Sequence, residues 1–155
     1  MQHISKSILI ILSILLFSSC NITGEEVGRL PINEVSRDNE NLIMKETTIT
    51  LKKDENIGFW SEMDMSYEGD LGLRFRIEIL KDDLPYGGLE IDPMEKNITL
   101  GEFKTDINGK VDWSFTGKNA SLTIDEDADY TFKGVLLSNN NPTLKIEKAE
   151  VIIKK

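Results

Sequence analysis

Strict alternation of apolar and polar residues is the feature that most limits how this chain can fold. It is clearest over residues 71–79, where the polar face of the expected strand carries Arg74, Arg76 and Glu78. The apolar face of the same strand consists of Leu71, Leu73, Phe75, Ile77 and Ile79. A period of two places alternate side chains on opposite faces of a strand. One buried and one solvated face are typical of antiparallel sheets, so we expect an all-β protein.

The same alternation recurs after residue 46 and predicts about eight or nine short strands. The expected strands cover residues 47–51, 57–65, 71–79, 98–104, 111–115, 120–124, 130–137 and 143–154, with a further short strand at 89–91. No segment shows a helical period of useful length. Strands of this number and spacing favour an antiparallel β-sandwich over other arrangements, with a barrel as the alternative.

Turn signals divide these strands. Asn108-Gly109 predicts a tight hairpin, because both residues accept positive φ at low cost. Residues 116–119 are expected to form another turn. In the last strand the apolar residues change parity, and a β-bulge near Glu147-Lys148 would return them to one face.

The first twenty residues have the composition of an export signal. Lys6 provides a positive charge, and an apolar run follows over residues 8–17. This run is shorter than the roughly 20 residues that a membrane-spanning helix needs. The small residues Ser18 and Ser19 then precede Cys20, which is where a signal peptide places its cleavage site.

Phe17-Ser18-Ser19-Cys20 resembles the lipobox of bacterial lipoproteins. The resemblance implies cleavage before Cys20, a diacylglycerol on its sulfur and attachment to a membrane through that anchor. Asn21 stands where inner-membrane lipoproteins often carry Asp, so the resemblance also implies the outer membrane of a Gram-negative bacterium. The alternatives are an ordinary secretory signal, or an uncleaved anchor with an incidental cysteine.

Three segments are therefore expected. Residues 1–19 form the lipoprotein signal peptide. Residues 20–45 contain the lipidated cysteine and a polar tether, interrupted by Gly24, Gly28 and Pro31. Residues 46–155 form the β-sandwich domain.

Charge and composition exclude several functions. The chain has 18 basic and 27 acidic residues, and Lys6 is the only charged residue in 1–19, so the mature chain has 17 against 27 and a net charge of −10. This charge disfavours nucleic acid and docking on anionic lipid. His3, the one histidine, lies in the signal peptide, and Cys20 is the one cysteine. The mature chain thus lacks Ser-His and Cys-His nucleophilic pairs and His- or Cys-based zinc sites.

The acidic turn Asp125, Asp127 and Asp129 is a candidate calcium site, because calcium prefers six to eight oxygen ligands. The spacing resembles the start of an EF-hand loop, but Tyr130 stands where that loop has Gly, and Leu136 where it has Glu. The alternative is a solvated turn. Asp82, Asp83 and Asp92 form a second acidic group with the same alternative. No other cofactor is expected.

Trp60 has the parity opposite to Phe59, so it could stand exposed as a stacking platform for a sugar, together with Tyr67 and Tyr86. The alternative places Trp60 in the core, as we also expect for Trp113. Residues 127–155 resemble the last two strands of jelly-roll modules, including carbohydrate-binding ones and those of small Bacteroidota-type lipoproteins of unknown function. The resemblance implies a jelly-roll-like sandwich.

The sequence therefore predicts a lipid-anchored, non-catalytic module of the cell envelope that binds a protein partner. The alternative is a carbohydrate-binding module that uses the exposed aromatic residues on a glycan partner. A hydrolase built on two carboxylates is a more distant alternative, since chance alone brings some acidic pair to the required separation in a chain this acidic.

Overall fold

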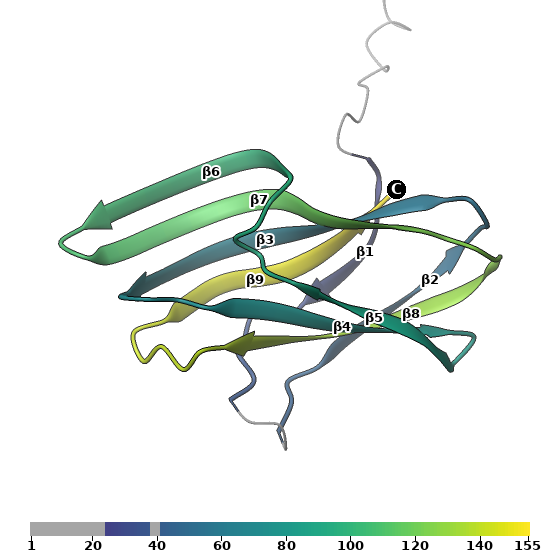
Figure 1. The fold of residues 1–155 in the computed structure, drawn as a ribbon, viewed down its shortest axis with the longest axis horizontal. Helices are drawn as coiled ribbons and strands as arrows, with labels where there is room; N and C mark the ends of the chain where they lie inside the picture. The colour runs from purple at the N-terminus through teal and green to yellow at the C-terminus, as the bar shows by residue number, and fades with distance from the viewer. Residues whose placement is uncertain (1–23, 38–40) are drawn as a thin grey trace, which may run out of the picture.

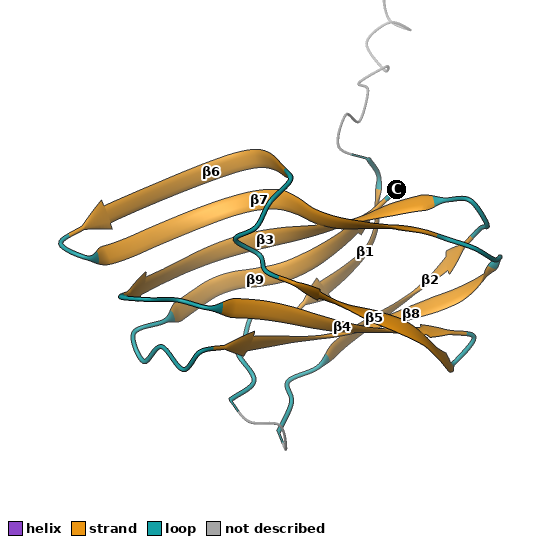
Figure 2. Cartoon of the chain, viewed as in Figure 1, coloured by secondary structure: helices purple, strands orange, loops and turns teal. Residues whose placement is uncertain are grey.

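The computed structural model describes residues 24–37 and 41–155, which form two antiparallel sheets (Figures 1 and 2). The strands are β1 (Glu26–Pro31), β2 (Lys45–Leu51), β3 (Asn56–Glu68), β4 (Leu73–Lys81), β5 (Leu84–Ile91), β6 (Ile98–Ile107), β7 (Lys110–Thr123), β8 (Ala128–Ser138) and β9 (Lys145–Lys154). The predicted all-β sandwich is confirmed. Among the described residues, no helix has the length and apolar character to span a bilayer.

At most of the connections between strands, the chain crosses from one sheet to the other. The five-stranded sheet has the order β1-β9-β3-β7-β6, and the four-stranded sheet has the order β2-β8-β4-β5. An eight-stranded jelly roll consists of two such antiparallel sheets. Without β6, four strands remain in each sheet, so β6 is an addition to the eight-stranded plan. It lies at the edge of the larger sheet, beside β7 (Figure 1).

One core fills the space between the sheets. It is formed by the inward residues of the alternating strands, as in the edge-to-face contact of Phe59 on β3 with Phe132 on β8, at 5.8 Å between ring centroids. Every strand except β6 contributes at least one residue to this core. The strand β6 therefore contributes little to the burial that drives folding.

The hairpin and the β-bulge follow the sequence prediction. Asn108 and Gly109 connect β6 to β7 with φ of 52° and 84°. The register between β3 and β9 slips by one residue at Glu147. Ile146 packs against the core on one side of this bulge and Ala149 lies within it on the other, which restores a single buried face.

The predicted turn at residues 116–119 is wrong. The strand β7 runs through these residues, and the register with β3 skips Asn119 instead. The Asn119 side chain accepts hydrogen bonds from the Ser61 amide and hydroxyl, at 3.0 and 2.7 Å, and donates to the carbonyl oxygens of Asp92 and Glu95. The chain thus forms a bulge at Asn119 instead of a turn. The hydrogen bonds of the Asn119 side chain hold in place the connection that leads into β6.

The predicted tether over residues 20–45 is wrong for the segment that forms β1. This strand pairs with β9, and Leu30 and Ile32 are buried in the core. Backbone hydrogen bonds also join Glu25 to Lys155. The segment is short and contains glycine and proline, so its order comes from the distant partner β9 and leaves a weak local pattern. The predicted signal peptide and Cys20 lie outside the described residues.

Candidate functional site

The three candidate aromatic residues do not share a surface. Trp60 is 4% exposed on the outer face of the five-stranded sheet, where the Lys154 ammonium lies 4.8 Å from its ring centroid. Tyr67 is buried in the core. Tyr86 lies on the other sheet, half-buried, with its ring edge-to-face against Tyr130 at 5.5 Å. The structure therefore does not bring Trp60, Tyr67 and Tyr86 together as a stacking platform.

Trp113 is at the margin of the core rather than inside it. Its ring is half-buried against Phe115, at 5.0 Å between centroids, and its Nε1 donates to Glu102 at 2.7 Å. Lys96 from the β5–β6 connection covers the same rings, with its ammonium 3.9 Å from the Phe115 centroid. The hydrogen bonds from Lys96 and then Trp113 hold the pKa of Glu102 below its ordinary value. A charged pair thus covers the end of the core under β6.

The carboxylates of the acidic turn point to separate protein partners. Asp125 accepts a hydrogen bond from the Tyr130 hydroxyl at 3.2 Å, Asp127 from the Lys53 amide at 2.7 Å and Asp129 from the Thr50 hydroxyl at 2.6 Å. Burial opposes ionisation of Asp125, but hydrogen bonds from Tyr86 and Tyr130 outweigh it and lower its pKa. The described part of the chain contains no group of three carboxylates, histidines or cysteines placed to hold a metal ion.

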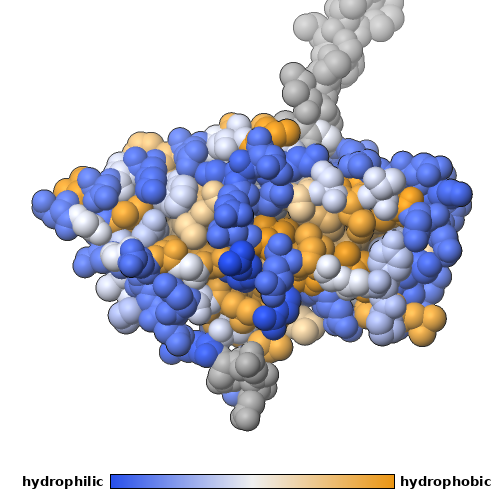
Figure 3. All heavy atoms as spheres, in the orientation of Figure 1, coloured by the Kyte–Doolittle hydropathy of each residue, from blue (hydrophilic) through white to orange (hydrophobic). Residues whose placement is uncertain are grey.

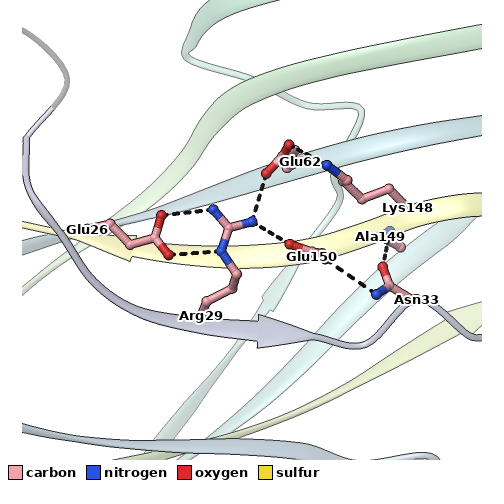
Figure 4. Close-up of polar contacts among 7 residues, drawn as sticks. All are labelled: Glu26, Arg29, Asn33, Glu62, Lys148, Ala149 and Glu150. Atoms are coloured by element: carbon pink, nitrogen blue, oxygen red, sulfur yellow. Dashed lines mark hydrogen bonds and ion pairs between the residues drawn. The ribbon is translucent and has the colours of Figure 1, made fainter.

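A network of charged residues from β1, β3 and β9 lies on the outer face of the five-stranded sheet, at the β1 side (Figure 4). Glu62 on β3 stands directly opposite Glu150 on β9, which is an unfavourable placement for like charges. The Arg29 guanidinium on β1 bonds to both, and to Glu26 through two bonds of 2.8 Å. Lys148 adds a bond of 2.9 Å to Glu62. The guanidinium thus allows two carboxylates to face each other.

This network suits structure rather than acid catalysis. The hydrogen bond from Lys148, and then that from Arg29, lowers the pKa of Glu62. Arg29 likewise lowers the pKa of Glu26, while its own pKa is raised, chiefly by Glu26. A general acid that works near neutral pH needs a carboxyl pKa shifted in the opposite direction. The lowered pKa values of Glu62 and Glu26 in Figure 4 are therefore opposite to the shift that a general acid requires.

The strand β6 has its polar and apolar faces reversed. Directly opposed residues of antiparallel strands project to the same face, so Glu102, which pairs with the core residue Phe115, faces inward. Phe103 pairs with Ser114, and Ile107 pairs with Lys110, on the outer face. The inward side of β6 is thus charged and its outward side is apolar, contrary to the other strands.

The exposed apolar residues concentrate on β6. Ile98 is 49% exposed, Leu100 46%, Phe103 66% and Ile107 67%, and we call these four residues with their strand the β6 edge. Hydrophobic side chains are visible along the upper left of Figure 3, over the β6–β7 hairpin. Elsewhere on the strands of the described chain, Leu84 is the other large apolar residue that is mostly exposed, at 69%. Several exposed apolar residues on one edge strand make that strand a candidate interaction surface.

An open hollow of about 390 Å³ lies beside this edge on the outer face of the sheet. Its lining includes Phe103 together with Glu62, Asp64, Thr116 and Lys148. Sites for small molecules enclose most of the ligand and are largely apolar. An open hollow beside an apolar strand is better suited to a protein surface.

Sequence reasoning missed the β6 edge for a definable reason. Alternation in residues 98–107 separates Phe103 and Ile107 from Glu102, Lys104 and Asp106, which normally indicates that the apolar set is buried. Its face is set instead by pairing with β7, which places Phe115 on the inward side. One signal was available in the sequence. Counting residues across the Asn-Gly turn places Phe103 and Ile107 on the face opposite to the apolar residues of 111–115.

No protein-family model and no curated protein matches the chain. Among solved structures, the chain is similar to a β-glucosidase from Paenibacillus barengoltzii, with 14% sequence identity and a TM-score of 0.34. The match covers 80% of this chain and 10% of the β-glucosidase chain, so the protein spans about a tenth of the length of that structure.

Proposed function

We propose that the protein is a lipid-anchored, non-catalytic binding module of the bacterial outer membrane, which takes an extended segment of a protein partner along the β6 edge. The observation that carries this proposal is the outward apolar face of a strand that adds no residue to the core. An edge strand presents unpaired amide and carbonyl groups to solvent. Addition of a partner strand would satisfy those groups and cover the apolar side chains.

The anchor rests on the lipobox resemblance at Phe17 to Cys20. In the structure, backbone hydrogen bonds between Glu25 and Lys155 hold the start of the domain against the end of β9. The four steps from Cys20 to Gly24 can span at most about 14 Å. A lipid on Cys20 would therefore hold the sandwich close to the bilayer, and the partner would be a membrane protein or a protein bound at the membrane surface.

Affinity capture tests the binding surface. The mature protein, with Phe103→Lys and Ile107→Lys introduced together, should fail to retain the partner that the unaltered protein retains from detergent-solubilised envelope. The matched control is Leu84→Lys, which changes an equally exposed apolar residue on β5. Equal retention by the double variant and the unaltered protein would contradict the proposal.

Metabolic labelling tests the anchor separately. The unaltered protein should incorporate labelled palmitate and fractionate with the outer membrane, and Cys20→Ala should remove the label. If both proteins remain unlabelled, the lipidation proposal is wrong, whatever the β6 edge binds.

A further inference from the structure

The sequence of β6 is complementary to itself when two copies are placed antiparallel. We propose that the segment bound along the β6 edge is β6 of a second copy of this chain, with Thr105 on the two-fold axis. This inference rests on the proposed function, since it names the partner of the same surface. The pairing would join two five-stranded sheets into one continuous sheet.

Charges match on the inward face of this pairing. With Thr105 opposite its own copy, Lys104 stands opposite Asp106 of the second copy, and the two-fold axis repeats the pair. Opposite charges at directly opposed positions stabilise antiparallel strands, whereas like charges destabilise them. Glu102 then faces Asn108, a polar residue of the hairpin turn.

Apolar side chains match on the outward face. In the same register Phe103 stands opposite Ile107 of the second copy, and this pair is also repeated. These two side chains are 66% and 67% exposed in the single chain. Pairs of aromatic and β-branched residues are among the favourable cross-strand combinations. One register therefore covers the two most exposed side chains of β6 and balances its charges.

Neighbouring registers lose this match. With Lys104 on the axis, Lys104 meets Lys104, and Glu102 meets Asp106. With Asp106 on the axis, Asp106 meets Asp106. With Phe103 on the axis, Glu102 meets Lys104 and Phe103 meets its own copy. Asp106 then stands opposite Leu100, and Ile107 opposite Thr99, so these two residues lose their matches. Among these registers, the one centred on Thr105 gives Lys104 and Asp106 an opposite charge and gives Phe103 and Ile107 an apolar partner.

The geometry of the fold leaves room for the second copy. The β6–β7 hairpin lies at the outer end of the five-stranded sheet, away from β1 and β2 (Figure 1). A two-fold interface uses the same patch on both subunits, as this self-pairing requires. Attachment of both copies to one membrane would also raise their effective concentration.

Charge exchange provides the sharpest test. The protein used is the chain from residue 20 onward with Cys20→Ser, which retains every described residue, and its dimer dissociation constant is measured by analytical ultracentrifugation. Lys104→Asp and Asp106→Lys should each weaken the dimer by about tenfold or more, because each variant opposes like charges twice. The two changes together should restore the dissociation constant to within a few fold. Restoration is specific to a register in which residues 104 and 106 face each other.

Cross-linking tests the axis. Thr105→Cys in the same background should form an intermolecular disulfide under mild oxidation, because directly opposed residues have Cα atoms about 4.5–5.5 Å apart. The control is Thr50→Cys on β2, an exposed position on the edge strand of the other sheet. Cross-linking at both positions would indicate nonspecific association and would overturn the proposal.

A monomer at all concentrations, with no Thr105→Cys disulfide, would also overturn the second copy as the partner. The proposed function would survive that result if Phe103→Lys with Ile107→Lys still abolished capture of a different envelope protein. If capture were unaffected as well, both proposals would fail.

Discussion

The two edges of the five-stranded sheet differ in how they are completed. The strand β1 has six residues, buries Leu30 and carries the Arg29 network on its outer face. Its Gly28 lies so close to β2 that an added Cβ would be 2.6 Å from the Ile49 side chain. The strand β6 has ten residues, no core residue and an apolar outer face in solvent. One edge is closed by packing and charge, and the other is left available for pairing.

The largest expected effect contrasts buried and exposed apolar residues on these edges. Leu30→Ala should lower the free energy of unfolding by about 2–5 kcal/mol, because it leaves a cavity in the core. Phe103→Ala should change it by less than about 0.5 kcal/mol. Urea denaturation of dilute protein measures both values. A loss above about 2 kcal/mol for Phe103→Ala would show that β6 belongs to the folding core after all.

A smaller effect is expected at the charged network. Arg29→Met should cost about 1–3 kcal/mol of unfolding free energy, because it leaves Glu62 opposite Glu150 without the bridging cation. Lys148→Met removes one exposed ion pair and should cost less than about 1 kcal/mol. If the two variants are equally stable in urea denaturation, the bridging role of Arg29 is wrong.

The pH dependence of the protein's stability should reflect the same charged network. The pKa values of Glu62 and Glu26 are lowered in the folded protein, so their contribution to stability is present above the ordinary value of 4.5 and is lost as the pH falls through the folded values. Thermal unfolding between pH 6 and pH 3 should show this decline. The decline should be shallower in Arg29→Met, and an unchanged slope would assign the acid sensitivity to other groups.

The smallest effect on stability is expected at the hairpin turn. Gly109→Ala should cost about 1 kcal/mol or less, because φ of 84° strains an alanine while no atom obstructs its Cβ. The same variant should make β6 less ordered and lower the affinity of any partner that binds along it. An unchanged binding constant alongside the lower stability would separate the turn from the binding surface.

Much of the sandwich could be predicted from local alternation. The strands around Ile49 and Phe75 show a clean period of two because one face packs in the core and the other meets water. The bulge at Glu147 was predictable because the apolar parity changes there. These features depend on residues that are close together in the sequence.

The features that the sequence could not predict depend on pairing between residues that are far apart along the chain. The strand β1 is ordered by β9, more than a hundred residues away, and Asn119 is a bulge because Ser61 and the β5–β6 connection bind its side chain. Trp60 is buried on the outer face beneath Lys154, which its parity could not reveal. The β6 edge was missed because its apolar face follows the usual pattern of a buried strand and points the other way.

The strand β1 is packed within its own chain, whereas we propose that β6 is completed by another chain. Amide hydrogen exchange tests it most directly, with the protein in its own membranes compared with the dilute purified protein. The β6 amides on the free edge should exchange faster in dilute solution and become protected in the membrane, while the β1 amides should be protected equally in both. Identical β6 exchange in the two samples would contradict this proposal.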